Sequence, residues 1–169
     1  MTDIAFDLPF EHLPVSPEQA HGEEGWHSWT LKGRTRYNTF VLGELHVRRE
    51  GEQCRLRMFP QRHHTNAADN IHGGTTLGLI DIALFATMHL SGTGDAGASV
   101  TVELSTQFVG AGDPTKPLDA VTEIVQETGR MLFARGQCVQ GDSVVASYSG
   151  IVRKIKPGVL LKKTSPSGA

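Results

Sequence analysis

The chain has 169 residues, enough for one domain with an adequate core and some tail. With 38% hydrophobic and 20% charged residues, its composition is that of an ordinary globular protein. The formal net charge of -2 gives no electrostatic case for binding nucleic acid or an anionic membrane. We therefore expect neither kind of partner.

The cysteines and the first residues indicate where the protein works. Cys54 and Cys138 lie in strand-like runs without metal or disulfide spacing, which favours a reducing compartment. The first 14 residues are acidic and proline-containing, unlike a secretion signal, and no stretch approaches the length of a membrane span. We expect a cytoplasmic protein.

Three parts are expected along the chain. Residues 1–25 carry prolines and acids without periodicity, and we interpret them as an extended arm whose end is held to the body by Trp26 and Trp29. Residues 26–154 form the domain, and 155–169 form a solvated tail. The arm either caps a pocket or covers the edge of a sheet.

Two strands are predicted first, over Phe40–Arg49 and Gln53–Phe59, with a hairpin-type turn at Glu50 and Gly51. In the second strand, apolar side chains alternate with two arginines, which predicts one buried face and one wet face. The apolar residues of this strand are Cys54, Leu56 and Met58.

One long helix is predicted over Gly73–His89. It is apolar on almost every side, as expected of a helix that other elements cover. From Thr75 to Leu90 the only formally charged side chain is Asp81. An ionised carboxylate in apolar surroundings loses several kcal/mol of solvation, so it is rarely kept without a partner or a task.

Four strands follow, the first of them alternating and the last three meandering after a loop rich in glycine and proline. They are Ser99–Phe108, Leu118–Glu127, Met131–Gln140 and Ser143–Arg153. The order β-β-α-β-β-β-β predicts an α+β protein, an antiparallel sheet around one buried helix. Because one sheet covers only part of so apolar a helix, a second copy is expected to cover more.

The start of the helix is built for an anion. Its first N–H groups have no acceptor inside the helix, and the glycines of the His72-Gly73-Gly74 run leave them open. With the positive end of the helix dipole, these donors suit a developing oxyanion. A lone acid and an open helix start together indicate acyl-transfer chemistry.

The element order and these motifs resemble the hotdog-fold acyl-CoA thioesterases, in particular the phenylacetate-degradation (PaaI-like) type. The resemblance covers roughly residues 36–154. It rests on Asn66, His72-Gly73-Gly74 and Asp81 at the family's spacing and in the family's order of elements.

The resemblance implies a role for each matching residue. Asp81 matches the catalytic carboxylate, which acts as nucleophile or as base for water. Gly73 matches the backbone N–H donor to the thioester oxygen, and Asn66 matches the group that orients water or substrate. Thr101 stands where the family often has a hydroxyl near the reacting water. His72 either shapes the loop through a hydrogen bond or takes part in the chemistry.

Helix geometry adds a constraint of its own. Gly73 and Asp81 are eight residues apart, so their backbones lie about 12 Å apart along one axis. One thioester carbonyl needs both the donor and the attacking oxygen within about 3 Å. We therefore predict an obligate homodimer in which Asp81 of one chain faces Gly73 and Asn66 of the other. A dimer of dimers is carried over from the resemblance.

Four further residues are candidates for binding the substrate. Gly74 shares the helix start, while Arg130, Arg153 and Lys154 lie near strand ends. The three basic residues either neutralise the phosphates of coenzyme A or form a solvated edge.

No cofactor is expected beyond the coenzyme A of the substrate. His63, His64 and His89 have no carboxylate or cysteine at ligand spacing, so no metal site is predicted.

The predicted function is hydrolysis of an acyl- or aroyl-CoA thioester to the free acid and coenzyme A. Two alternatives remain, a hotdog enoyl-CoA hydratase or dehydratase and a non-catalytic acyl-CoA-binding protein. Simpler readings of the residues also remain open. Asp81 could pair with a lysine or arginine, the two glycines could only permit close packing, and Asn66 could be only a turn residue.

Overall fold

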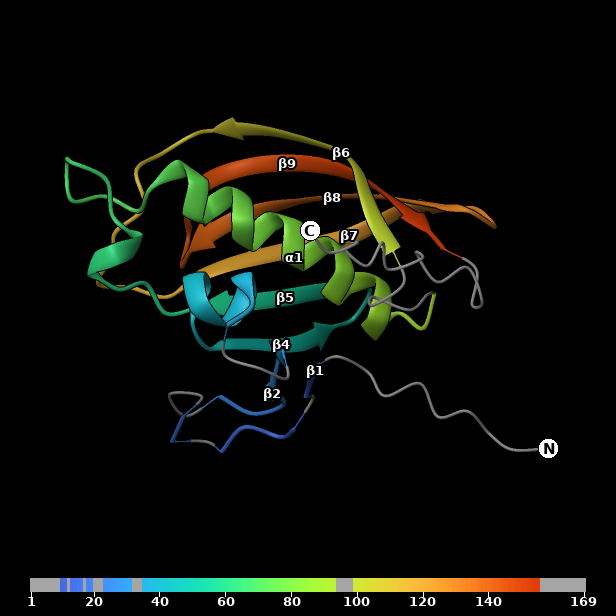
Figure 1. Cartoon of the computed structure of the whole chain (residues 1–169), viewed down its shortest axis with the longest axis horizontal. Coiled ribbons are helices and arrows are strands. Elements are labelled where there is room, and N and C mark those ends of the chain that lie inside the picture. The colour runs from blue at the N-terminus through green and yellow to red at the C-terminus, as the bar shows by residue number, and fades with distance from the viewer. Residues whose placement is uncertain are drawn as a thin grey trace, which may run out of the picture.

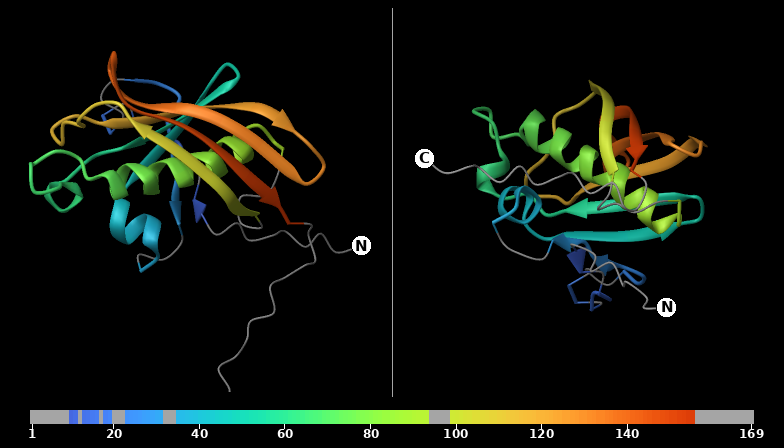
Figure 2. Two further views of the ribbon diagram at one scale, coloured as in Figure 1. Left: turned by 90° about the horizontal axis from the view of Figure 1, so that it is seen from above. Right: turned by 45° about the vertical axis from the view of Figure 1, so that its right-hand side comes forward.

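The computed structural model describes residues 10–11, 13–16, 18–19, 23–31, 35–93 and 99–155. One long helix, α1 (Gly73–Leu90), lies against an antiparallel sheet of seven strands. The strands, in the order in which they lie across the sheet, are β2 (His27–Ser28), β4 (Leu45–Glu50), β5 (Gln53–Met58), β7 (Leu118–Glu127), β8 (Met131–Gln140), β9 (Ser143–Lys154) and β6 (Ser99–Phe108). Figure 1 shows α1 crossing in front of the sheet, and Figure 2 shows the sheet curving over it. The predicted hotdog architecture is confirmed.

All neighbouring strands of the sheet are antiparallel, and tight turns link several of the pairs. Gly51 links β4 to β5 and Gly141 links β8 to β9, each with a φ of 60°. This left-handed conformation is costly for residues with a side chain and matches the twist of a short hairpin. β6, which follows α1 in the chain, pairs with β9 and forms one edge of the sheet. β2 forms the other edge.

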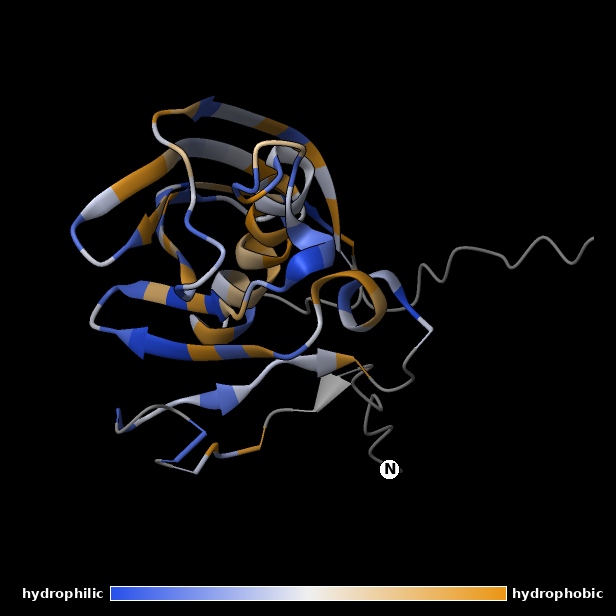
Figure 3. Cartoon of the chain, turned by 90° about the vertical axis from the view of Figure 1, so that its left-hand side faces the viewer, coloured by the Kyte–Doolittle hydropathy of each residue, from blue (hydrophilic) through white to orange (hydrophobic). Residues whose placement is uncertain are grey.

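The core lies between α1 and the inner face of the sheet. The alternation predicted for β5 is observed, with Cys54, Leu56 and Met58 buried and the arginines between them on the outer face. Figure 3 shows the same alternation of hydrophobic and hydrophilic residues along the strands that surround the helix. α1 buries residues on most of its sides, as its apolar sequence predicts.

The expectation that no stretch approaches a membrane span needs correction. By length and composition alone, Gly73–Leu90 qualifies, with 18 residues and a mean hydropathy of 1.2. This segment is the core helix, and 56% of it is buried inside the fold. Its hydrophobicity is explained by the sheet that packs on it.

The first predicted strand begins later than expected. Instead of a strand from Phe40, the chain forms a short π-type helix, η1 (Asn38–Leu42), and β4 begins at Leu45. Gly43, with a φ of 75°, separates the two elements. The run of apolar residues 40–42 is typical of a strand, but in the structure these residues form a helical turn. Leu42 is buried as part of that turn.

The N-terminal segment adds short strands that the sequence analysis did not predict. β1 (Phe10–Glu11) pairs with β3 (Thr30–Leu31), and β2 pairs with β4. The edge of β4 is therefore covered by β2, which follows the predicted arm of residues 1–25, and Pro14 within the arm forms an isolated bridge with His27. Trp26 and Trp29 are both buried. The tail over 156–169 lies outside the described residues.

A cluster of charges fastens this segment to the outer face of the sheet. The guanidinium groups of Arg48 and Arg57 each lie 4.5 Å from the centre of the Trp26 ring. Glu23 accepts hydrogen bonds from Arg48 (2.6 Å), Arg57 (3.0 Å) and the Trp26 indole (3.2 Å). Burial by itself raises the pKa of Glu23, but the bonds from Arg57 and Trp26 and the charges of both arginines bring it below its ordinary value.

Candidate active site

Asp81 lies in the middle of α1 and is half-buried. The hydroxyl of Thr101, on β6, donates a hydrogen bond to Oδ1 of Asp81 at 2.5 Å. Among the residues that the structure describes, no lysine, arginine or histidine forms an ion pair with this carboxylate. The reading of Asp81 as half of a structural ion pair therefore has no support within this part of the chain.

Asp81 faces a hollow of about 170 Å³. One side of the hollow is formed by α1, and another by the N-terminal segment. The lining residues are Trp29, Leu31, Asn38, Asp81, Ile82, Phe85 and Ser99. The carboxylate thus opens onto a small space with mostly apolar walls.

The start of α1 is capped by His72. Its Nδ1 accepts a hydrogen bond from the backbone N–H of Gly74 at 2.9 Å, while its carbonyl accepts from Thr75 and Thr76. These bonds satisfy most of the donors that a helix start leaves open. Within the described residues, the N–H of Gly73 has no such acceptor. Gly73 therefore carries the available donor, and the N–H of Gly74 is already in use.

A side chain at Gly73 would also crowd the site. A Cβ built there would lie 3.2 Å from Cζ of Phe108, the last residue of β6. Phe108 is more than half exposed, with 54% of its surface accessible, so its ring has room to move. The open backbone of Gly73 and the ring of Phe108 thus lie side by side at this end of the helix.

Asn66 uses its side-chain oxygen to close a turn. Oδ1 accepts from the N–H of Ala68 (2.9 Å) and of Asn70 (3.2 Å). This is the turn role that Asn side chains commonly play. It leaves the Nδ2 group, which donates to no other described residue. Any contact of Asn66 with substrate or water would therefore be through a donor.

His64 holds this loop against the body of the protein. It is buried, its Nε2 bonds the Val41 carbonyl (2.6 Å), and its Nδ1 accepts from the N–H of Gln61 (2.8 Å). Burial lowers the pKa of His64 by more than the bond to Val41 raises it, so the ring is neutral at neutral pH. The carbonyl of His64 also accepts from the N–H of His72, which ties the loop to the helix start.

The predicted basic residues gather at the other end of α1. Lys154 pairs with Ser99 in register, and its backbone N–H donates to the Arg130 carbonyl. The ammonium group of Lys154 forms an ion pair with Glu127, while Arg130 and Arg153 are exposed.

The predicted site residues therefore form three groups along one helix. Asp81 and Thr101 are together, Asn66 with 72–74 lies at the start of α1, and the basic residues lie near its end. Because α1 is continuous from Gly73, the first two groups remain about 12 Å apart within one chain.

The sequence analysis missed the walls of the hollow beside Asp81. Asn38 and Leu31 carry no motif, and Trp29 was assigned only an anchoring role. The approach of Trp29 and Leu31 to Asp81 depends on the pairing of two-residue strands, for which the sequence gives almost no signal. Phe85, one turn after Asp81, was the one wall residue that helical spacing could have identified.

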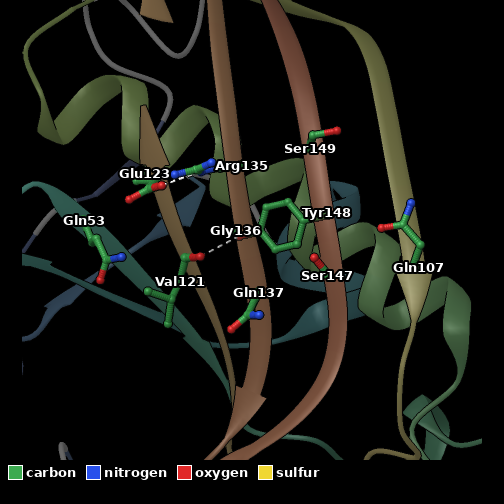
Figure 4. Close-up of a pocket in the computed structure, with 10 residues that line it drawn as sticks. All are labelled: Gln53, Gln107, Val121, Glu123, Arg135, Gly136, Gln137, Ser147, Tyr148 and Ser149. Atoms are coloured by element: carbon green, nitrogen blue, oxygen red, sulfur yellow. Dashed lines mark hydrogen bonds and ion pairs between the residues drawn. The ribbon is translucent and has the colours of Figure 1, made fainter. Parts of the chain in front are cut away.

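A second, larger hollow of about 430 Å³ lies across the outer face of the sheet (Figure 4). Its charged residues are already paired, since Arg135 donates to Glu123 at 2.5 Å. Polar side chains such as Gln137 and Ser147 make up much of the rest. It contains none of the predicted site residues.

Comparisons with known proteins show what the chain and its fold are similar to. Residues 68–147 match the model of the thioesterase superfamily, a range that includes Gly73, Asp81 and Thr101. No curated protein sequence matches the chain at a significant level.

Several solved structures have the same fold. The PaaI protein from the phenylacetic acid degradation operon of E. coli is 18% identical with a TM-score of 0.62, over 73% of this chain and 87% of that one. The PaaI protein of Thermus thermophilus is 20% identical with a TM-score of 0.60, over 71% and 100%. Thioesterase superfamily member 2 of Mus musculus is 16% identical with a TM-score of 0.60, over 71% and 90%. Residues 68–147 are thus similar to the thioesterase superfamily, and the chain has the hotdog fold of these solved structures.

Proposed function

We propose that the protein hydrolyses acyl-CoA thioesters to the free acid and coenzyme A, with Asp81 as the catalytic carboxylate. One observation carries this proposal. A half-buried carboxylate lies at the mouth of an apolar hollow, held by the hydroxyl of Thr101 and without an ion-pair partner among the described residues. A carboxylate so placed is available to attack a carbonyl or to take a proton from water.

In the proposed reaction, an oxygen attacks the thioester carbonyl, and the C–S bond breaks as coenzyme A leaves as a thiolate. The attacking oxygen comes from water that loses a proton to Asp81, or from Asp81 itself, after which water cleaves the resulting anhydride. Both routes consume one water and release one acid and one thiol. The Thr101 hydroxyl fixes the orientation of the carboxylate in either case.

The oxyanion that forms on the carbonyl oxygen needs a hydrogen-bond donor to stabilise it. The N–H of Gly73 is open at the start of α1, where the helix dipole favours negative charge. Because this group lies about 12 Å from Asp81 of the same chain, we propose that it acts on the carbonyl held by Asp81 of a second copy. Asn66 would add its Nδ2 donor from the same side.

Surface features support pairing of two copies through β6 and α1. β6 is an edge strand of ten residues with one charged side chain, Glu103. Long, weakly charged edges are usually paired or covered. Apolar side chains are exposed close by, including Val102 (54%), Phe108 (54%) and Leu77 (37%). A second copy would cover this surface.

An antiparallel pair would also give the basic residues a role. It would bring the start of one α1 toward the end of the other, where Arg130 and Arg153 are exposed. These guanidinium groups would then lie on the same side as the shared site and could bind the phosphates of coenzyme A. Buried free thiols at Cys54 and Cys138 fit the cytoplasm, where we expect the protein to act.

Release of free thiol from a panel of acyl-CoAs tests the proposal. We expect turnover by the wild-type protein and a loss of about a thousandfold or more in kcat for Asp81→Asn. The variant should stay folded, because the carboxylate has no ion-pair partner to lose among the described residues. Binding without turnover by the wild-type protein would instead identify an acyl-CoA-binding protein.

A further inference from the structure

The hollow beside Asp81 is lined in part by residues that lie outside the part of the chain matching the thioesterase superfamily. Trp29 and Leu31 come from the N-terminal segment, and Asn38 comes from η1. The matched range begins only at residue 68. The matched range therefore does not include these three lining residues.

Trp29 lies at one end of the hollow. Asp81, Phe85 and His89 follow one another at intervals of four residues along a single face of α1. The ring of Trp29 lies against the ring of His89, with 5.4 Å between their centroids. The indole thus lies on the side of Asp81 away from Gly73, toward the end of α1 that carries His89.

The indole is firmly placed. The backbone N–H of Trp29 donates to the Leu45 carbonyl at 2.7 Å, and only 4% of the residue is exposed. The neighbouring β2 pairs with β4, and β3 pairs with β1, so the segment is held on both sides of Trp29. A side chain held in this way forms a fixed wall.

We propose that Trp29 closes the acyl pocket and limits the length of the acyl group that the protein accepts; this inference rests on the proposed function. The hollow of about 170 Å³ is close to the volume of an apolar cavity that holds one benzene ring, about 150 Å³. An acyl group of about that size fits between Asp81 and Trp29. A longer chain would have to pass the indole.

Chain-length profiles test this directly. We would compare kcat/KM for straight-chain acyl-CoAs from butanoyl to dodecanoyl in the wild-type protein, Trp29→Leu and Trp26→Phe. One methylene in a tight pocket changes kcat/KM by about tenfold or more. Trp29→Leu should therefore raise the ratio of kcat/KM for dodecanoyl-CoA to kcat/KM for hexanoyl-CoA by at least that factor. Trp26→Phe, on the same segment but on the outer face of the sheet, should keep the wild-type ratio. A folded Trp29→Leu protein with an unchanged profile would overturn the inference.

The two tryptophans provide a second readout that does not need turnover. Trp26 and Trp29 are the only tryptophans of the sequence, so Trp26→Phe leaves Trp29 as the sole reporter and Trp29→Phe leaves Trp26. Titration with S-hexyl-CoA, a non-hydrolysable thioether, should change the fluorescence of Trp29 and not that of Trp26. Coenzyme A without the alkyl group should change neither.

These readouts separate failure of the inference from failure of the proposed function. No thiol release from any acyl-CoA, with a Trp29 response to the thioether, would refute hydrolysis and support the pocket. Thiol release without a Trp29 response, or with the response remaining in Trp29→Phe, would refute the role of Trp29 and leave hydrolysis standing.

Discussion

At the scale of single residues, the hydroxyl of Thr101 is the clearest partner of Asp81, at 2.5 Å. We predict that Thr101→Val lowers kcat by about tenfold to a hundredfold, because a hydrogen bond to a charged group contributes about 1.5–3 kcal/mol. Thr101→Ser should restore most of the activity, while KM changes little in either variant. Steady-state kinetics measure the effects on kcat and on KM separately.

Thr106 provides a matched control on the same strand. Its hydroxyl is buried without a hydrogen-bond partner among the described residues, so Thr106→Val should leave kcat unchanged and the protein at least as stable. Equal losses of activity in the Thr101 and Thr106 variants would show that the loss comes from disturbing β6 and not from removing the hydrogen bond to Asp81.

The two cysteines lead to a prediction about reactivity. Burial raises the pKa of Cys54 and of Cys138 to about 12, so both remain thiols at neutral pH. Native protein treated with iodoacetamide should gain no mass, and unfolded protein should gain two labels. Rapid labelling of the native protein would contradict the buried positions.

The same pKa shifts imply alkaline sensitivity. Unfolded thiols ionise from about pH 8.5, while the buried ones do not until about pH 12. Their contribution to the free energy of unfolding is therefore complete below the lower value and is lost as the pH rises between the two.

Residue-level prediction from the sequence was uneven for physical reasons. Asp81 was identifiable because a lone charge in an apolar helix is costly. The capping bond of His72 to Gly74 was one of two expected roles. Trp29 was not identified as part of the hollow, because its contact with the region of Asp81 is set by tertiary pairing and has no local pattern.

At the scale of elements, the start of α1 allows a precise test of the open N–H of Gly73. Proline is well tolerated at the first position of a helix, and His72 before it has an extended backbone, with φ of -66° and ψ of 139°. Gly73→Pro thus removes one donor with little disturbance. We predict a loss of about a hundredfold to a thousandfold in kcat, the usual effect of losing an oxyanion donor.

Gly73→Ala is the matched control, since it places a similar atom near Phe108 but keeps the N–H. It should retain clearly more activity than Gly73→Pro. If the two variants lose equal activity, crowding near Phe108 and not the missing donor is responsible.

The N-terminal segment should loosen in acid. The pKa of Glu23 is lowered in the folded protein, so its bonds to Arg48 and Arg57 stabilise the fold above about pH 4.3 and are lost as the pH falls through the folded-state pKa. Glu23→Gln should therefore be less stable than wild type at neutral pH, with the difference shrinking in acid. Denaturation at several pH values measures this.

Glu24→Gln removes the same charge at the neighbouring, exposed position. It should show no such pH-dependent difference. A comparable difference in both variants would assign the effect to net charge and not to the bonds around Trp26.

The sequence predicted elements well where their patterns were long. The helix and the last four strands agree with their predicted ranges to within a residue, because ten or more residues of clear periodicity define each. The start of β4 was misplaced, because an apolar turn such as 40–42 reads as strand until Gly43 breaks it. Strands of two residues have no periodicity to detect.

At the scale of the whole molecule, the predicted order of elements determined the architecture. Six long strands and one apolar helix have few ways to bury the helix, and the antiparallel sheet around α1 is one of them. The N-terminal strand β2, which completes one edge, was beyond prediction. The opposite edge, β6, is left for a second copy in the arrangement we propose.

That arrangement pools Asp81 of one chain with Gly73 of the other, and subunit complementation tests it most directly. Asp81→Asn and Gly73→Pro would be co-expressed with different tags, and the heterodimer would be purified through both tags. Each parent homodimer should be nearly inactive. In the heterodimer one of the two sites would contain both intact groups, so we predict about half of the wild-type rate per dimer. A heterodimer as inactive as its parents would contradict a shared site.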